Sequence, residues 1–174
     1  MDKTDAYRIE IPELCLIALI GATSSGKSSF AKGHFKPTEV LSSDFFRGMV
    51  CDDENDQSVS GDAFDLLFDA AGKRLSNGKL TVIDATNIQQ SARKKVIDLA
   101  REQDVHAVAI VLDMPEELLS ERNKARPDRN FPDRIIRQHC REVRRSIRGL
   151  KREGFRFVFV LDSPEKAENA QIVR

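Results

Sequence analysis

Several features of secreted and membrane proteins are scarce in this chain of 174 residues. It has no tryptophan, one tyrosine and three cysteines, and these cysteines (Cys15, Cys51 and Cys140) are odd in number and far apart. That spacing is neither a disulfide framework nor a zinc-binding pattern. The longest apolar run, residues 14–20, is far shorter than the ~20 residues of a membrane-spanning helix, and residues 1–13 are too polar for a signal peptide. We therefore expect a soluble cytoplasmic protein without a membrane partner.

Net charge is also absent, because 28 lysines and arginines balance 28 aspartates and glutamates. Attraction to a polyanion must then come from local clusters, such as the basic residues between 122 and 152. Acidic residues crowd into positions 52–56. The length fits a single domain over residues 1–174 and leaves no room for a second catalytic domain.

A glycine-containing segment directly after the first apolar run carries the clearest functional signal. Residues 21–28 read GATSSGKS, a complete GxxxxGK[ST] phosphate loop between a predicted strand and a predicted helix. Such a loop points backbone N–H groups and the positive end of the helix at phosphate oxygens. Lys27 would bind the β- and γ-phosphates of ATP or another NTP, and the Ser28 hydroxyl would bind Mg²⁺. The predicted nucleotide-binding residues of the loop are Gly21, Thr23, Ser24, Ser25, Gly26, Lys27, Ser28 and Ser29.

Strand-like apolar runs alternate with helical patterns along the rest of the chain. We expect strands at residues 14–20, 39–41, 80–84, 105–112 and 155–161, with residues 7–11 as an edge extension. Expected helices cover residues 27–34, 61–75, 91–103 and 132–151, and one more begins at Pro115. This alternation predicts a three-layer α/β fold, a parallel five-stranded sheet with helices on both faces.

Acidic side chains follow two of these strands, at the edge that would face the phosphate loop. Asp44 could orient an acceptor hydroxyl and accept its proton, while Arg47 binds a phosphate of the same acceptor. In the alternative, Asp44 caps a helix and Arg47 is a surface cation. Asp84 is expected near Mg²⁺, through a bound water, and Asn87 is expected to fix the loop after the strand near the substrate. Each also has a purely structural interpretation.

Arginines form two further patterns. Arg122, Arg126 and Arg129 surround Pro127 in a predicted mobile lid over residues 122–134, where guanidinium groups would stabilise the transferred phosphoryl group. A solvated cluster is the alternative. Along the predicted helix 132–151 a stripe of arginines matches a nucleic-acid backbone, or else is a solvated face. Its members are Arg134, Arg137, Arg141, Arg144, Arg148 and Arg152, with Arg145 and Lys151 nearby.

With these residues assembled, the chain resembles the kinase domain of bacterial polynucleotide kinase–phosphatase–ligase proteins, which heal and seal broken RNA or DNA ends. The resemblance covers about residues 11–164. The segments that carry it are residues 21–30, 35–40, 42–45, 52–57, 84–87, 121–124 and 147–155. It implies an adenylate-kinase-like P-loop phosphotransferase that moves the γ-phosphate of an NTP to the 5′-OH of a polynucleotide. If the chain is an excised domain, phosphatase and ligase domains of the same polypeptide are implied partners.

The resemblance also implies roles for single residues. Asp44 would be the general base, Arg47 would contact the phosphate 3′ to the reacting nucleoside, and Arg122 and Arg126 would act from the lid. Gln57 and Ile135 match positions that flank the terminal base. With Lys27, the catalytic set is then Asp44, Arg122 and Arg126, and the remaining substrate contacts are Arg47, Gln57, Asn87, Arg129 and Ile135.

One residue departs from the family pattern. Ser24 stands where such kinases often have glycine, and a non-glycine residue with positive φ carries a steric cost. Two other functions stay open at this point: a P-loop kinase of a small hydroxylated metabolite, and a nucleotide-binding regulatory module without turnover.

Overall fold

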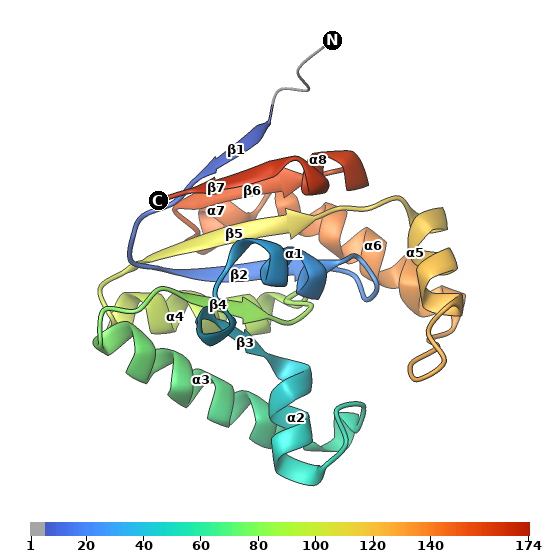
Figure 1. The fold of residues 1–174 in the computed structure, drawn as a ribbon, viewed down its shortest axis with the longest axis horizontal. Helices are drawn as coiled ribbons and strands as arrows, with labels where there is room; N and C mark the ends of the chain where they lie inside the picture. Colours follow the sequence, from blue (N-terminus) through green and yellow to red (C-terminus); the bar gives the residue numbers. More distant parts are fainter. Residues whose placement is uncertain (1–5) are drawn as a thin grey trace.

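The computed structural model describes residues 6–174, so residues 1–5 of the predicted domain lie outside the described part (Figure 1). Its centre is a five-stranded sheet in the order β3-β4-β2-β5-β6. The strands are β2 (Cys15–Gly21), β3 (Val40–Ser42), β4 (Thr81–Asp84), β5 (His106–Leu112) and β6 (Phe157–Leu161). Every neighbouring pair is parallel. The predicted five-stranded parallel sheet is confirmed.

Strand β2 is buried along its whole length because helices cover both faces of the sheet. Alternate side chains of a strand point to opposite faces. Cys15, Ile17 and Leu19 therefore share one core cluster with Phe30 and Ala31 of α1 (Lys27–His34). Leu16, Ala18 and Ile20 share the other cluster with Val96, Ile97 and Ala100 of α4 (Gln90–Glu102).

The remaining helices are α2 (Ser43–Cys51), α3 (Ser60–Ser76), α5 (Glu116–Lys124), α6 (Asp133–Ile147), α7 (Leu150–Glu153) and α8 (Pro164–Glu168), and η1 (Pro37–Glu39) and η2 (Gln57–Val59) are 3-10 turns.

The prediction of one helix over residues 132–151 is wrong in one respect, because this segment forms two helices. Helix α6 ends at Ile147 and α7 begins at Leu150. Before the break, the Ser146 hydroxyl donates to the Val143 carbonyl, and the Gly149 N–H bonds to the Ser146 carbonyl at 2.8 Å. Glycine is a weak helix former, and serine bonded back to the preceding turn competes with the helical ladder. The apolar pattern continues across the break, which explains why the sequence suggested a single helix.

The first strand is not an extension of the central sheet, contrary to our prediction. Strand β1 (Tyr7–Glu10) pairs in parallel with β7 (Ala170–Val173) in a separate two-stranded sheet. Figure 1 shows this pair beside β6 and α8, where the last residues of the chain return to its beginning. Neither β7 nor α8 was predicted. Within residues 6–174, no helix combines the length and apolarity that a membrane span requires.

The parallel arrangement decides where the polar segments lie. The carboxyl ends of parallel strands meet at one edge of the sheet. The phosphate loop follows β2, helix α2 follows β3, and Asp84 is the last residue of β4. Segments distant in the sequence are thereby brought to one edge.

Candidate active site

This edge of the sheet borders a cavity of about 1020 Å³. Most of the predicted site residues line it. They are Thr23, Ser24, Ser25, Gly26, Lys27, Ser28, Ser29, Asp44, Arg47, Gln57, Asp84, Arg122, Arg126, Arg129 and Ile135. Gly21 does not line the cavity and lies just beneath it, where its carbonyl accepts a hydrogen bond from Lys27.

The backbone of the phosphate loop is tightly curled. Gly26 has φ 92° and Ser24 has φ 63°, so the expected positive φ at Ser24 is present. A Cβ on Gly21 would lie 2.6 Å from Ser25 Oγ and 3.1 Å from the Leu112 carbonyl oxygen, which only glycine avoids. Among the described residues, Ser24 Oγ is a buried side-chain atom without a hydrogen-bond partner. An unpartnered hydroxyl in a loop of this shape fits a ligand with several acceptor oxygens, such as a nucleotide phosphate.

Lys27 is buried at the start of α1, with 8% of its surface exposed. Its ammonium group donates to the carbonyls of Gly21 and Ala22, at 3.0 and 2.8 Å, and to Ser25 Oγ at 3.3 Å. None of these acceptors is charged, and burial lowers the pKa of Lys27 from 10.5 to about 8. A phosphate beside this group would compensate for its lost hydration.

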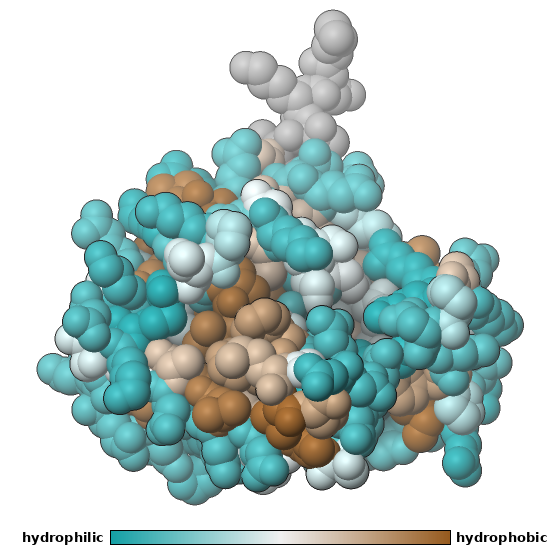
Figure 2. Space-filling model, turned by 60° about the horizontal axis from the view of Figure 1, so that its bottom comes forward, coloured by the Kyte–Doolittle hydropathy of each residue, from teal (hydrophilic) through white to brown (hydrophobic). Residues whose placement is uncertain are grey.

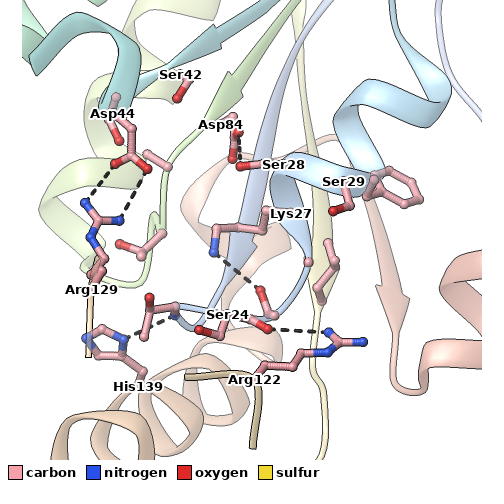
Figure 3. Close-up of a pocket in the computed structure, with 18 of the residues that line it drawn as sticks. Ser24, Lys27, Ser28, Ser29, Ser42, Asp44, Asp84, Arg122, Arg129 and His139 are labelled. Carbon is pink, nitrogen blue, oxygen red and sulfur yellow. Dashed lines mark hydrogen bonds and ion pairs between the residues drawn. The ribbon is translucent and has the colours of Figure 1, made fainter. Parts of the chain in front are cut away.

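Ser28 and Asp84 form the second polar contact of the loop. Ser28 Oγ donates to Asp84 Oδ2 at 2.7 Å, and burial raises the pKa of Asp84. Figure 3 shows both side chains next to Lys27. Across residues 6–174 there is no group of three or more His, Cys, Asp or Glu side chains that could hold a metal. A cation such as Mg²⁺, which keeps most of its waters and shares phosphate oxygens, needs no such group, so Ser28 and Asp84 fit it.

Asp44 lies in the first turn of α2, opposite the phosphate loop. The helix is capped by Ser42, whose hydroxyl accepts from the Phe45 N–H, so the alternative that Asp44 is the N-cap is wrong. Arg47 is not a surface cation either: it is 5% exposed, pairs with Asp44 and donates from Nε to the Glu54 carbonyl at 2.8 Å. The carboxylate and the guanidinium therefore form one fixed unit inside the cavity.

The same carboxylate is also bound by the predicted lid, as Figure 3 shows. Arg129 Nη2 lies 3.0 Å from Asp44 Oδ1, and Arg129 Nη1 lies 3.3 Å from Asp44 Oδ2. This two-pronged contact engages both oxygens of Asp44. Oδ1 accepts from both Arg47 and Arg129, whereas Oδ2 accepts from Arg129 alone and keeps a second lone pair for another donor.

The three lid arginines have different partners. Arg122 Nη1 donates to the Ser24 carbonyl at 3.4 Å, and Arg126 Nη2 lies 3.5 Å from Asp128 Oδ2. Asn123, which is 1% exposed, holds the lid in place because its amide bonds the side chain of Asn130 and the backbone of Phe131. The lid thus reaches the phosphate loop through one arginine and Asp44 through another.

Two residues differ from the predicted set of cavity residues. Asn87 does not line the cavity: it is 4% exposed and donates to the Leu19 carbonyl at 2.8 Å, so of its two predicted roles the structure supports fixing the loop after β4. His139 was not among the predicted site residues, yet it lines the cavity, and its Nδ1 accepts from the Thr23 N–H at 3.5 Å. Burial lowers the pKa of His139, which suits a neutral acceptor. The one sequence feature that could have indicated this position of His139 is its four-residue spacing from Ile135. On a helix this spacing places both side chains on one face.

An apolar surface adjoins the Asp44 side of the cavity. Phe45 and Met49 of α2 are 57% and 62% exposed, and Leu66 of α3 is 44% exposed. Figure 2, which brings the lower part of Figure 1 forward, shows hydrophobic side chains gathered in the middle of that face. Phe64 of α3 lines the cavity itself. The cavity is thus cationic at the lid and apolar near α3.

Comparison with known proteins agrees with this geometry. Residues 16–150 match the model of a protein family described as AAA domain. The chain is 30% identical over 130 residues to the L-seryl-tRNA(Sec) kinase of Methanococcus maripaludis. The aligned region covers 70% of this chain and 49% of that protein. It therefore spans about half the length of this curated relative.

Solved structures that share the fold include the following two. A chain of the Pnkp1/Rnl/Hen1 RNA repair complex is 24% identical with a TM-score of 0.66, over 88% of this chain and 49% of that chain. A gluconokinase from Sinorhizobium meliloti 1021 is 19% identical with a TM-score of 0.53, over 91% of this chain and 90% of that chain. At these identities the likeness establishes the P-loop kinase fold and leaves the acceptor open.

Proposed function

Because the chain belongs to the AAA domain family and has the fold of a P-loop kinase, we propose that it is a polynucleotide 5′-hydroxyl kinase. In this proposal it transfers the γ-phosphate of ATP or another NTP to the 5′-OH end of RNA or DNA during the repair of broken ends. Its cofactor would be Mg²⁺, held by Ser28 and, through water, by Asp84.

The observation that carries the proposal is the pairing of Asp44 with Arg47 across the cavity from the phosphate loop. A carboxylate next to a guanidinium suits an acceptor with a hydroxyl close to a phosphate, which is what the end of a polynucleotide offers. Gln57 and Ile135 also line the cavity, as expected of residues that flank a terminal base.

The chain's own residues have separable tasks in this reaction. Lys27 and the loop N–H groups bind the phosphates, and Mg²⁺ would neutralise part of their charge. Asp44 orients the 5′-OH and takes its proton as the oxygen attacks the γ-phosphorus. The bond from the γ-phosphorus to the β–γ bridging oxygen breaks, and the nucleoside diphosphate leaves. In this proposal the lid arginines Arg122, Arg126 and Arg129 supply positive charge at the phosphoryl group, where it stabilises the transition state.

The relatives support an acceptor that is a nucleic acid. The curated relative is named as a kinase of L-seryl-tRNA(Sec), so its named acceptor is carried by an RNA, and one structural neighbour comes from an RNA repair complex. The gluconokinase neighbour keeps a small hydroxylated metabolite as the competing acceptor.

The test is transfer of label from [γ-³²P]ATP with Mg²⁺ to a 5′-OH oligonucleotide, beside a 5′-phosphorylated control. We expect label on the 5′-OH strand alone. Asp44→Ala should lower turnover by about 10²–10⁴-fold, the usual contribution of a general base, and nucleotide binding should persist. Label on gluconate-like polyols but on neither RNA nor DNA would refute the proposal and favour the metabolite kinase.

A further inference from the structure

A row of arginines on α6 starts at the edge of the cavity and leads away from it. Arg134, Arg137, Arg141 and Arg145 follow one another at spacings of three and four residues, so they share one face of the helix. We call these four residues the α6 stripe. All four are exposed. The stripe begins beside the cavity, because Arg134 is followed by Ile135, which lines it.

These side chains are available to a ligand. The four arginines line a surface depression of about 540 Å³ together with Gln138 and Glu142. In the described chain, residues 6–174, none of the four side chains takes part in an ion pair or hydrogen bond. The acidic member of the set, Glu142, accepts from the amides of Gln89 and Gln138, both at 3.1 Å.

The structure also changes the membership of the row predicted from sequence. Arg144 lies 3.2 Å from Asp113 and is neutralised by it. Arg148 directly follows the last residue of α6, Arg152 belongs to α7, and neither lines the depression. Arg145, which the sequence placed only near the stripe, lines the depression and joins the row.

We propose that the α6 stripe binds the phosphodiester backbone of the acceptor strand on the 3′ side of the nucleotides held in the cavity. This inference rests on the proposed polynucleotide kinase function and adds a second contact region to it. The stripe spans residues 134–145, roughly 16 Å at a rise of 1.5 Å per residue. At about 3.4 Å per phosphate of a stacked strand, that length accommodates four or five phosphates. Guanidinium groups without protein partners are complementary to such a row of anions.

The experiment compares a 5′-OH dinucleotide with a 5′-OH 12-mer as acceptors of label from ATP. The test variant is Arg137→Gln/Arg141→Gln/Arg145→Gln, which leaves the cavity and the lid unchanged. The matched control, Lys73→Gln/Lys79→Gln/Lys95→Gln, removes the same charge from exposed positions of α3, the following turn and α4. Acceptor KM is measured from 50 to 200 mM NaCl, and thermal melting verifies that both variants fold.

The wild type and the control should prefer the 12-mer, whereas the stripe variant should lose that preference and keep its rate on the dinucleotide. Neutralising three phosphates of a single strand contributes about −2 to the slope of log affinity against log salt concentration. The slope measured with the 12-mer should therefore become less steep by about 2 in the stripe variant. Over a fourfold change of salt this difference equals roughly twenty-fold in KM. Unchanged length preference and salt slope in an active stripe variant would overturn the inference and leave the kinase assignment intact. Absence of label on every oligonucleotide with the wild type would overturn the kinase assignment and this inference with it.

Discussion

The titration of Lys27 predicts how nucleotide affinity depends on pH. In the free protein burial lowers the pKa of Lys27 to about 8, whereas bound phosphates would keep its ammonium group protonated well above that value. Binding above pH 8 then requires uptake of a proton. The dissociation constant should therefore rise about tenfold for each pH unit above 8, up to roughly 300-fold at the ordinary lysine value of 10.5.

The same shift affects stability with a definite sign. Between pH 8 and 10.5 the unfolded chain binds the Lys27 proton and the folded chain does not, so the free energy of unfolding contributed by Lys27 rises with pH in this window. Below pH 8 the buried charge costs on the order of 3 kcal/mol, at 1.36 kcal/mol per pKa unit.

The assay is titration of a fluorescent ADP analogue from pH 7 to 10 in EDTA, so that no metal takes part. The last ionisation of the phosphates, with a pKa of about 6, is nearly complete at pH 7 and changes little above it. Lys27→Arg provides the control, because a guanidinium does not titrate in this range. The dissociation constant of this variant should not change with pH. A wild-type affinity that stays constant from pH 7 to 10, like that of the arginine variant, would refute the reasoning.

Two further predictions concern stability. Because burial raises the pKa of Asp84, the folded protein loses stability as pH rises through the window between 3.8 and that raised value. Asp84→Asn should therefore melt higher than the wild type at pH 8, and the gain should shrink toward pH 4; a loss at both values would contradict this explanation. Arg93 is 3% exposed and bonds Glu153 with Nε and Nη2 at 2.7 and 2.8 Å. Arg93→Ala should lower the free energy of urea unfolding by about 3–5 kcal/mol, since it leaves a largely buried carboxylate unpaired. Arg93→Ala/Glu153→Leu should recover only part of this loss, because the carbonyls of Asn87 and Ile88 also lose their hydrogen bonds from Arg93. A cost below about 1 kcal/mol for the single change would mean that the pair behaves as a surface ion pair.

Much of the site was predictable because its elements are local in sequence. The phosphate loop needs only a strand, eight consecutive residues and a helix, and the helix begins and ends where the pattern predicted, at Lys27 and His34. Asp44 and Asp84 were predicted at the edge near the loop because each follows or ends an apolar run. The parallel sheet follows from alternating apolar periods, which require burial on two faces.

The contacts that distinguish this site depend on tertiary structure. The Asp44–Arg129 pair joins residues 85 apart, and the Thr23–His139 contact joins residues 116 apart. No periodicity encodes such pairs, so His139 was missed and Asn87 was placed among the substrate contacts. Whether Asp44 caps α2 or points into the cavity also depends on its neighbours: Ser42 caps the helix, so Asp44 does not.

By itself, the sequence determined the strand–loop–helix unit, the order of buried strands along the chain and the residue types available for phosphoryl transfer, because each depends on local spacing and burial. Only the tertiary structure decided the strand order in the sheet, the pairing of β1 with β7, the break at Gly149 and the partners of each lid arginine. These depend on which distant segments pack together, and that outcome is set by the shape of the whole core.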